Sequence, residues 1–154
     1  MINGVKIKQL KVHQDIPDTD QTQDLGVLME VVRDDEGLLS KFGQSTMSIA
    51  PQGTIKAFHH HKYQDDLWFI ASGKAKIVLY DTRKDSPTFK ESQVIEAGEN
   101  DYKVVLIPIG VAHGYKVLSK EPVILFYHTT KSYDAKNPDE ERLAWDYLGK
   151  EIWE

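Results

Sequence analysis

Three histidines and an acidic pair lie close together in the stretch "GTIKAFHHHKYQDDLWFIASG". His59, His60 and His61 are consecutive, and Asp66 follows a few residues later. Side chains two positions apart on a strand share a face, so His59 and His61 would converge on one side of the sheet. If the chain turns at "KYQD", Asp66 arrives beside them from the adjacent strand. An imidazole can accept a proton near neutral pH or bind a metal ion, so this stretch predicts one of these two kinds of site.

A further histidine, His113, follows in the stretch "IPIGVAH" and could complete such a site. The chain contains no cysteine, so every candidate metal ligand is a nitrogen or an oxygen. Such ligands suit iron, manganese, nickel or zinc, and the residues do not choose between them. The sequence therefore predicts a candidate site for one divalent metal ion of open identity, with four ligands: His59, His61, Asp66 and His113.

The other histidines are expected to be structural. A single histidine on a strand is more often a hydrogen-bonded core or surface residue than a ligand, which is how we interpret His13, His60 and His128. Asp65 is interpreted as a solvated turn residue.

Short segments with alternating or β-branched residues must position these side chains, because they recur every ten to fifteen residues with turn residues between them. This pattern predicts an all-β domain, such as a double-stranded β-helix jelly roll. The expected strands are "VKIKQLKV", "VLMEVVR", "QSTMSIA", "TIKAFHHH", "LWFIAS", "KAKIVLYDT", "SQVIEA", "KVVLIPIG", "AHGYKVLS" and "PVILFYHTT".

Two local signals predict finer structure. Ser72-Gly73 between "LWFIA" and "KAKIVLY" predicts a hairpin that pairs these two strands, because glycine supplies the positive φ of a tight turn. The tail "NPDEERLAWDYLGKEI" has Asn137 before Pro138 and has Gly149 near its end. These are helix start and stop signals, so we expect one short C-terminal helix.

Composition excludes several classes of partner. The 154 residues suit one domain, residues 1–154, and the net charge of −5 leaves 19 basic residues scattered among 24 acids, so we expect no nucleic-acid partner. The N-terminus alternates, and no apolar stretch approaches the roughly 18 residues of a membrane span, so we expect neither secretion nor membrane insertion. A chain without cysteine suits the reducing cytoplasm.

Two motifs resemble those of the cupin superfamily. The second motif is represented by three residues of "IPIGVAH": Pro108, Gly110 and His113. The first has aspartate where its glutamate ligand usually stands, and its positions are Gly53, His59, His61, Asp66 and Gly73.

A sharper resemblance covers about residues 43–146. The blocks "GTIKAFHHH", "DTRKDSPTF", "IPIGVAHGYKVLS", "FYHTTKSYDA" and "LAWD" resemble, in order, those of the dTDP-4-dehydrorhamnose 3,5-epimerase family. The resemblance implies a jelly-roll dimer that moves a proton next to the ketone of a nucleotide-linked 4-keto-6-deoxy sugar. It implies that His59 is the general base, that Tyr127 is the acid on the opposite face, and that His113 lines the same pocket. The residues expected to contact the substrate are Gln44, Lys56, His61 and Tyr133.

The chemistry of the two main residues fits these roles. Abstraction of a proton next to a carbonyl works best with a base whose pKa is near neutral, as that of imidazole is. The alternative for Tyr127 is an aromatic residue of the β-core, since "PVILFYHTT" is rich in strand-forming residues.

Three positions depart from the family pattern. Asp66 stands in place of a lysine that steadies the enolate oxygen, and a carboxylate would oppose that developing charge. Leu25 and Lys56 replace two arginines that grip the nucleotide, and lysine lacks the planar fork of arginine. A metal ion acting as Lewis acid could compensate at Asp66.

Three functions follow from these observations. The first is a sugar epimerase or isomerase acting on a keto sugar, with a dTDP-sugar as a candidate. The second is a metal-dependent cupin enzyme, either a dioxygenase or a metal-assisted isomerase, and the third is a sugar-binding cupin without catalysis. We also expect a homodimer, in which "VKIKQLKV" could add to the sheet of a partner, while its lysines would discourage that pairing.

Overall fold

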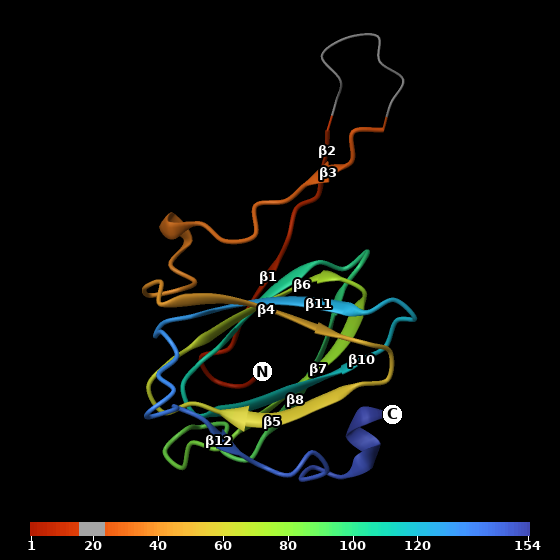
Figure 1. The fold of residues 1–154 in the computed structure, drawn as a ribbon. Helices are drawn as coiled ribbons and strands as arrows, with labels where there is room; N and C mark the ends of the chain where they lie inside the picture. The colour runs from red at the N-terminus through yellow and green to blue at the C-terminus, as the bar shows by residue number, and fades with distance from the viewer. Residues whose placement is uncertain (16–23) are drawn as a thin grey trace.

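Two five-stranded antiparallel sheets make up most of the fold (Figure 1). The computed structural model describes residues 1–15 and 24–154. One sheet has the order β1-β9-β6-β11-β4, with strands at Lys6–Gln9, Lys103–Ile107, Asp66–Ser72, Val123–Thr129 and Gln44–Ala50. The other has the order β12-β5-β10-β7-β8, with strands at Glu141–Arg142, Ile55–His60, Val111–Val117, Lys74–Asp81 and Ser92–Gly98. The predicted all-β jelly-roll fold is confirmed.

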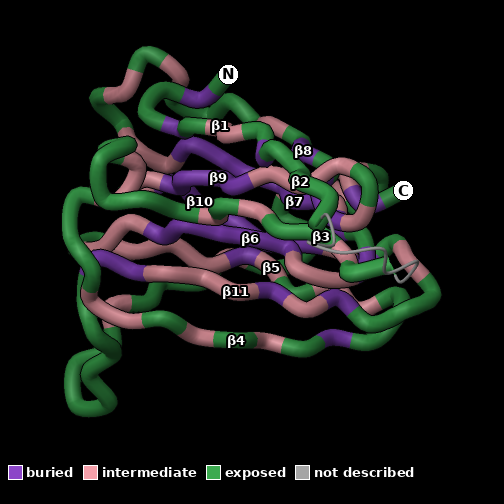
Figure 2. The backbone as a smooth tube through the Cα atoms, turned by 90° about the horizontal axis from the view of Figure 1, so that it is seen from above, coloured by how far each residue is buried: buried purple, intermediate pink, exposed green. Residues whose placement is uncertain are grey.

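The main core lies between the two sheets and follows from the alternation of each strand. In β7, Ala75, Ile77 and Leu79 are buried in the main core, while Val78 and Tyr80 belong to a second cluster with Trp153 on the other face. This is the period of two that a strand imposes on its side chains. Figure 2 shows the buried residues concentrated on inner strands such as β6 and β9, while the edge strand β4 is mostly exposed or half-buried.

The predicted hairpin at Gly73 is wrong. β6 and β7 are separated only by Gly73, yet they lie in different sheets. Both sides of β6 are already occupied, by β9 and by β11, so β7 pairs with β10 and β8 instead. Gly73 has a φ of 70°, and it takes the chain from one sheet to the other.

The C-terminal helix is present, but it begins where the signals predicted its end. Gly149, with a φ of 87°, precedes the short 3-10 helix η2 at Lys150–Trp153. The segment expected to be helical instead contains β12, which pairs with β5, and Leu143 exchanges two backbone hydrogen bonds with Phe58. Pairing with the open edge of β5 therefore outweighs the local helix signals.

The N-terminal segment has two parts. β1 pairs with β9 of its own chain and forms one edge of that sheet, so among the described residues only one side of the strand expected to join a partner's sheet is paired. Beyond it, β2 at His13–Gln14 and β3 at Val27–Leu28 form a small ladder that projects from the body (Figure 1). The 3-10 helix η1 at Asp34–Glu36 then leads back toward β4. No helix within residues 1–15 or 24–154 is long and apolar enough to span a membrane.

Candidate active site

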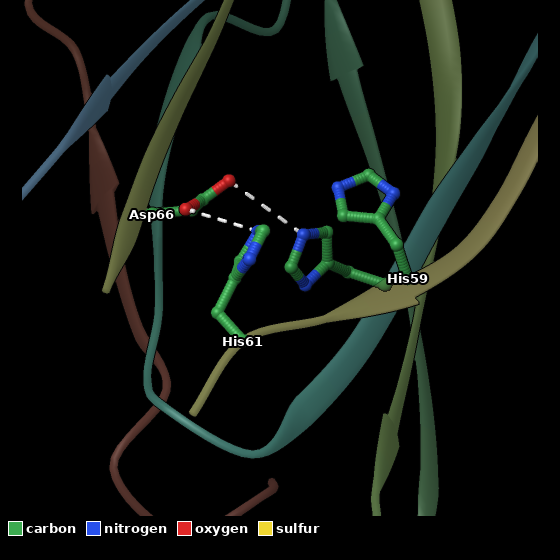
Figure 3. A group of neighbouring side chains, drawn as sticks. His59, His61 and Asp66 are labelled. Atoms are coloured by element: carbon green, nitrogen blue, oxygen red, sulfur yellow. Dashed lines mark ion pairs between the residues drawn. The ribbon is translucent and has the colours of Figure 1, made fainter. Parts of the chain in front are cut away.

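The four predicted metal ligands lie close together between the sheets. Figure 3 shows three of them, His59, His61 and Asp66, grouped together. His59 lies on β5 and His113 lies opposite it on the neighbouring strand β10. His61 follows the end of β5, and Asp66 begins β6. The four ligand atoms lie within 4.8 Å of one another. Asp66 comes from the opposite sheet and not from an adjacent strand as expected, because the turn after His61 carries the chain across the sandwich.

Asp66 is the buried centre of this cluster. Its side chain is 1% exposed, and it accepts hydrogen bonds from Gln64 Nε2 at 3.0 Å and Trp68 Nε1 at 3.2 Å. Nε2 of His61 and Nε2 of His113 each lie 3.6 Å from one of its oxygens. Burial alone would raise the pKa of Asp66, but contact with His113 and His61 outweighs burial and holds that pKa well below its usual range. Asp66 therefore contributes a negative charge.

Backbone carbonyls orient two of the imidazoles. His113 Nδ1 lies 2.8 Å from the carbonyl oxygen of Val111, and His61 Nδ1 contacts the carbonyl oxygen of Asp139. Because a carbonyl only accepts, each Nδ1 must carry the proton that it donates. The Nε2 atoms are then free to face Asp66, and that of His113 has no hydrogen-bond partner among the described residues. A lone pair facing a carboxylate is unfavourable until a proton or a cation lies between them.

His59 is held as a neutral imidazole. Its ring centroid lies 4.2 Å from that of His113 and 5.3 Å from that of His61. Burial, followed by the charges that His113 and His61 carry when protonated, lowers the pKa of His59 to about 2. For His61 the order differs, because burial lowers its pKa but the hydrogen bond and charge of Asp66 raise it above its ordinary value. The two imidazoles therefore differ strongly in proton affinity.

Tyr127 lies in the other sheet, on β11. Burial raises its pKa, although a hydrogen bond with Thr46 acts in the opposite direction. The phenol therefore keeps its proton at neutral pH and can donate it.

A cleft of about 1050 Å³ gives access to this cluster. Six of the predicted site residues line it: Gln44, His59, His61, Asp66, Tyr127 and Tyr133. His113 is 1% exposed and lies behind the wall. Lys56 does not line the cleft, since its amine donates to Ser48 Oγ at 2.9 Å at an exposed position. Leu25, 44% exposed, is also absent from the lining.

Much of the cleft wall comes from a segment of which the sequence interpretation assigned only Tyr133 to the site. This segment comprises residues 131–142, and we call it the strap. Among its members, Asp139 holds the turn that carries His61, and Lys131 and Arg142 add positive charge. Apart from β12 the strap has no regular structure, so no periodic pattern marks it, and its contacts span more than 70 residues of sequence.

Asp65 is not the solvated turn residue that we predicted. It is half-buried, and its Oδ1 accepts the backbone N–H of Ile109 at 2.9 Å. Its own backbone N–H donates to Thr130 Oγ1 at 2.9 Å. Asp65 thereby fixes the chain immediately before Asp66 to the segments that follow β9 and β11.

The chain is similar to several known proteins. The family model described as dTDP-4-dehydrorhamnose 3,5-epimerase matches residues 2–151. The spore coat polysaccharide biosynthesis protein SpsL of Bacillus subtilis is 50% identical over 146 residues, which is 95% of this chain and 91% of that protein. The probable low-salt glycan biosynthesis epimerase Agl13 of Haloferax volcanii is 33% identical, covering 94% of this chain and 89% of that protein.

A solved structure extends the comparison. The dTDP-6-deoxy-D-glucose-3,5-epimerase of Legionella pneumophila, in complex with dTDP-4-keto-L-rhamnose, superposes with a TM-score of 0.79. Its sequence is 25% identical, and the match covers 96% of this chain and 75% of that one.

Proposed function

The chain belongs to the dTDP-4-dehydrorhamnose 3,5-epimerase family, and from that membership we propose that it epimerises a nucleotide-linked keto sugar, with a dTDP-sugar as the first candidate. The reaction is proton transfer at a carbon next to the ketone. One observation carries the proposal: His59 and Tyr127 line one cleft but come from opposite sheets of the sandwich. A base and an acid on opposite walls can act on opposite faces of one carbon, which inverts its configuration. Family membership also favours an isomerase over a dioxygenase or a sugar-binding protein.

His59 is proposed as the base because it is unprotonated and reaches the cleft. Its low pKa keeps the lone pair available, but the buried imidazolium is costly until a negative charge appears nearby. The enolate that forms on proton removal supplies such a charge, together with Asp66. Tyr127 is proposed to return a proton from the other wall, because its raised pKa keeps the phenol protonated.

Solvent-deuterium exchange tests this proposal. The wild-type protein should exchange the proton next to the ketone of one or more nucleotide-linked 4-keto sugars, as followed by NMR or mass spectrometry. Without the base, His59→Gln should lose about 10²- to 10⁴-fold in exchange rate while keeping its fold. Asp85→Asn, at an exposed position outside the cleft lining, is the matched control. No exchange into any substrate of the panel by the wild-type protein would reject the proposal.

A specific observation favours a second, metal-assisted form of the same reaction. The Nε2 atoms of His61 and His113 face the Asp66 carboxylate, and His59 is near enough to join them. Three nitrogens and a carboxylate suit a divalent ion, and the carbonyls on the two Nδ1 atoms resemble the outer contacts of metal-bound histidines. A bound ion would act there as a Lewis acid on the ketone oxygen. His59 would then be a ligand, and it could not also be the free base.

Metal analysis separates the two forms. Protein purified without a histidine tag should contain about one divalent ion per chain if the site is a metal centre. Asp66→Lys would then lower metal affinity by orders of magnitude, because it replaces a ligand with a positive charge. If the site works without metal, the same variant should keep or increase proton exchange, because an ammonium stabilises the enolate.

We further propose a cytoplasmic homodimer. The absence of cysteine from the sequence supports a location in the reducing cytoplasm. Self-association is supported by the projecting β2–β3 ladder, whose Val27 and Leu28 are 48% and 52% exposed and would gain from burial.

A further inference from the structure

Asp139, on the strap, makes three contacts with the three residues that follow β5. Its Oδ1 accepts the backbone N–H of Lys62 at 2.8 Å, and its Oδ2 accepts that of Tyr63 at 2.8 Å. Its backbone carbonyl contacts Nδ1 of His61. Asp139 therefore accepts hydrogen bonds from three consecutive residues, one from the ring of His61 and two from the backbone of Lys62 and Tyr63. None of these three residues lies in a strand.

We propose that Asp139 is a positioning residue, which fixes His61 in the tautomer and orientation that present its Nε2 to Asp66. The Asp139 carboxylate binds the backbone of residues 62 and 63, and this contact keeps the Asp139 carbonyl oxygen next to Nδ1 of His61. An imidazole whose Nδ1 donates to a carbonyl leaves Nε2 unprotonated in its neutral form. This inference rests on the proposed function in one respect, namely that Nε2 of His61 faces the reacting groups.

A comparison within the site supports this role. His113 has the same arrangement, but its carbonyl acceptor belongs to Val111, two residues away on the same strand. Val111 is held in place by its ladder pairing with Asp81 of β7. The acceptor for His61 lies 78 residues away on an irregular segment, so it needs another anchor. The bidentate contact of the Asp139 carboxylate with two backbone amides provides that anchor.

The strap offers a matched control in Asp134. This carboxylate also lines the cleft, but it accepts hydrogen bonds from within its own segment, from the backbone of Lys136 at 2.9 Å and from Asn137 Nδ2 at 3.5 Å. Removing it takes the same charge from the same wall without releasing residues 61–63. An effect of charge alone would therefore appear equally in Asp134→Ala and Asp139→Ala.

The experiment measures the tautomer of His61 by two-bond ¹H–¹⁵N NMR of metal-free protein, at a pH high enough that the His61 ring is neutral. The His61 signals are identified by their loss in His61→Gln. In the wild type and in Asp134→Ala we expect the Nδ1–H tautomer. In Asp139→Ala we expect the Nε2–H tautomer to appear, with a fall of about 10- to 100-fold in deuterium exchange into substrate. Asp139→Asn keeps one of the two amide acceptors and should lie between the wild type and Asp139→Ala.

An unchanged His61 tautomer in folded Asp139→Ala, or in Asp139→Asn should the alanine variant not fold, overturns the proposal. A changed tautomer with unchanged exchange also overturns it, because His61 would then not need this orientation. The tautomer is read without substrate. If the wild type exchanges no substrate proton, the proposed function fails, and the NMR comparison alone still decides whether Asp139 sets the tautomer.

Discussion

His59 and Tyr127 divide the proposed reaction between two side chains with opposite proton preferences. Burial keeps the imidazole free of its proton and keeps the phenol protonated, so one desolvated cleft prepares both a base and an acid. Neither group needs to be charged before the substrate binds. This matters because an isolated charge buried in the cleft would be costly.

Replacing Tyr127 with phenylalanine should separate exchange from inversion. His59 can still remove the proton and return one from solvent to the same face, so deuterium exchange should continue. Formation of the epimer should fall by about 10²- to 10⁴-fold, because no acid remains on the opposite wall. NMR of the product in D₂O measures both quantities. Equal epimer formation by Tyr127→Phe and the wild type would assign the second proton to another group.

Asp66 shows how a site departs from its family at a single side chain. The carboxylate is retained at 1% exposure because two imidazoles, an indole and an amide surround it. A buried carboxylate with so many partners stays ionised. Its charge draws a cation or a proton to Nε2 of His61 and His113, whereas the lysine of the family pattern would repel one.

At the level of elements, the loop after β7 is organised by another buried carboxylate, Asp81. It accepts from Arg83 Nε and Nη2 at 2.8 Å, from Ser86 Oγ at 2.6 Å and from Thr88 Oγ1 at 2.7 Å. These residues belong to the stretch "DTRKDSPTF". Burial would raise the pKa of Asp81, but the hydrogen bonds from Arg83, Ser86 and Thr88 outweigh burial and lower that pKa. The polar residues of this stretch therefore have a structural role, which is to hold the loop around Asp81.

Asp81→Asn should make the free energy of unfolding less dependent on pH in the acid range. The folded-state pKa of Asp81 lies below its unfolded value of about 3.9, so its contribution is complete above that pH and is lost as the pH falls toward the folded pKa. At neutral pH the variant should lose about 2–3 kcal/mol in free energy of unfolding, and the difference should shrink below about pH 4. Urea unfolding at several pH values measures this, with the exposed Asp85→Asn as control. A difference that is constant with pH would contradict the assignment.

At the level of the whole molecule, the projecting β2–β3 ladder gains little stability within a single chain. Two strands of two residues each bury little surface, and isolated ladders of this size are marginal in water. Its exposed Val27 and Leu28 belong to none of the hydrophobic clusters of the described residues. Burial of these two side chains against a second copy of the chain would stabilise the ladder.

Leu28→Asp should therefore convert the proposed dimer into a monomer. Sedimentation of the wild type at micromolar concentration should give about twice the chain mass of 17.6 kDa, and the variant should approach that mass. A charge in an apolar interface costs several kcal/mol, which is enough to dissociate a small dimer. Val94→Asp, at a 46% exposed position on β8, is the control and should remain a dimer. A monomeric wild type would contradict the prediction.

Local sequence was sufficient for the strands and for part of the site. Every expected strand segment contains a strand, because alternation and turn residues act within a few positions of the chain. The same period of two predicted that His59 and His61 lie together, and the cupin spacing added Asp66 and His113, whose ligand atoms lie near them in the structure. Residue types and their spacing therefore predicted the fold class and the centre of the cluster.

Only the tertiary structure decided which strands pair and what surrounds the cluster. The signal at Gly73 was local, but β7 could not pair with β6 because β9 and β11 already occupy both of its sides. The helix signals near Pro138 likewise yielded to the open edge of β5. Asp139 carries no periodic signal, and it reaches His61 across 78 residues because the strap folds back over β5. Sequence reports the preference of each segment, whereas the partner of a hydrogen-bonding edge or of a buried nitrogen depends on what the rest of the chain has already occupied.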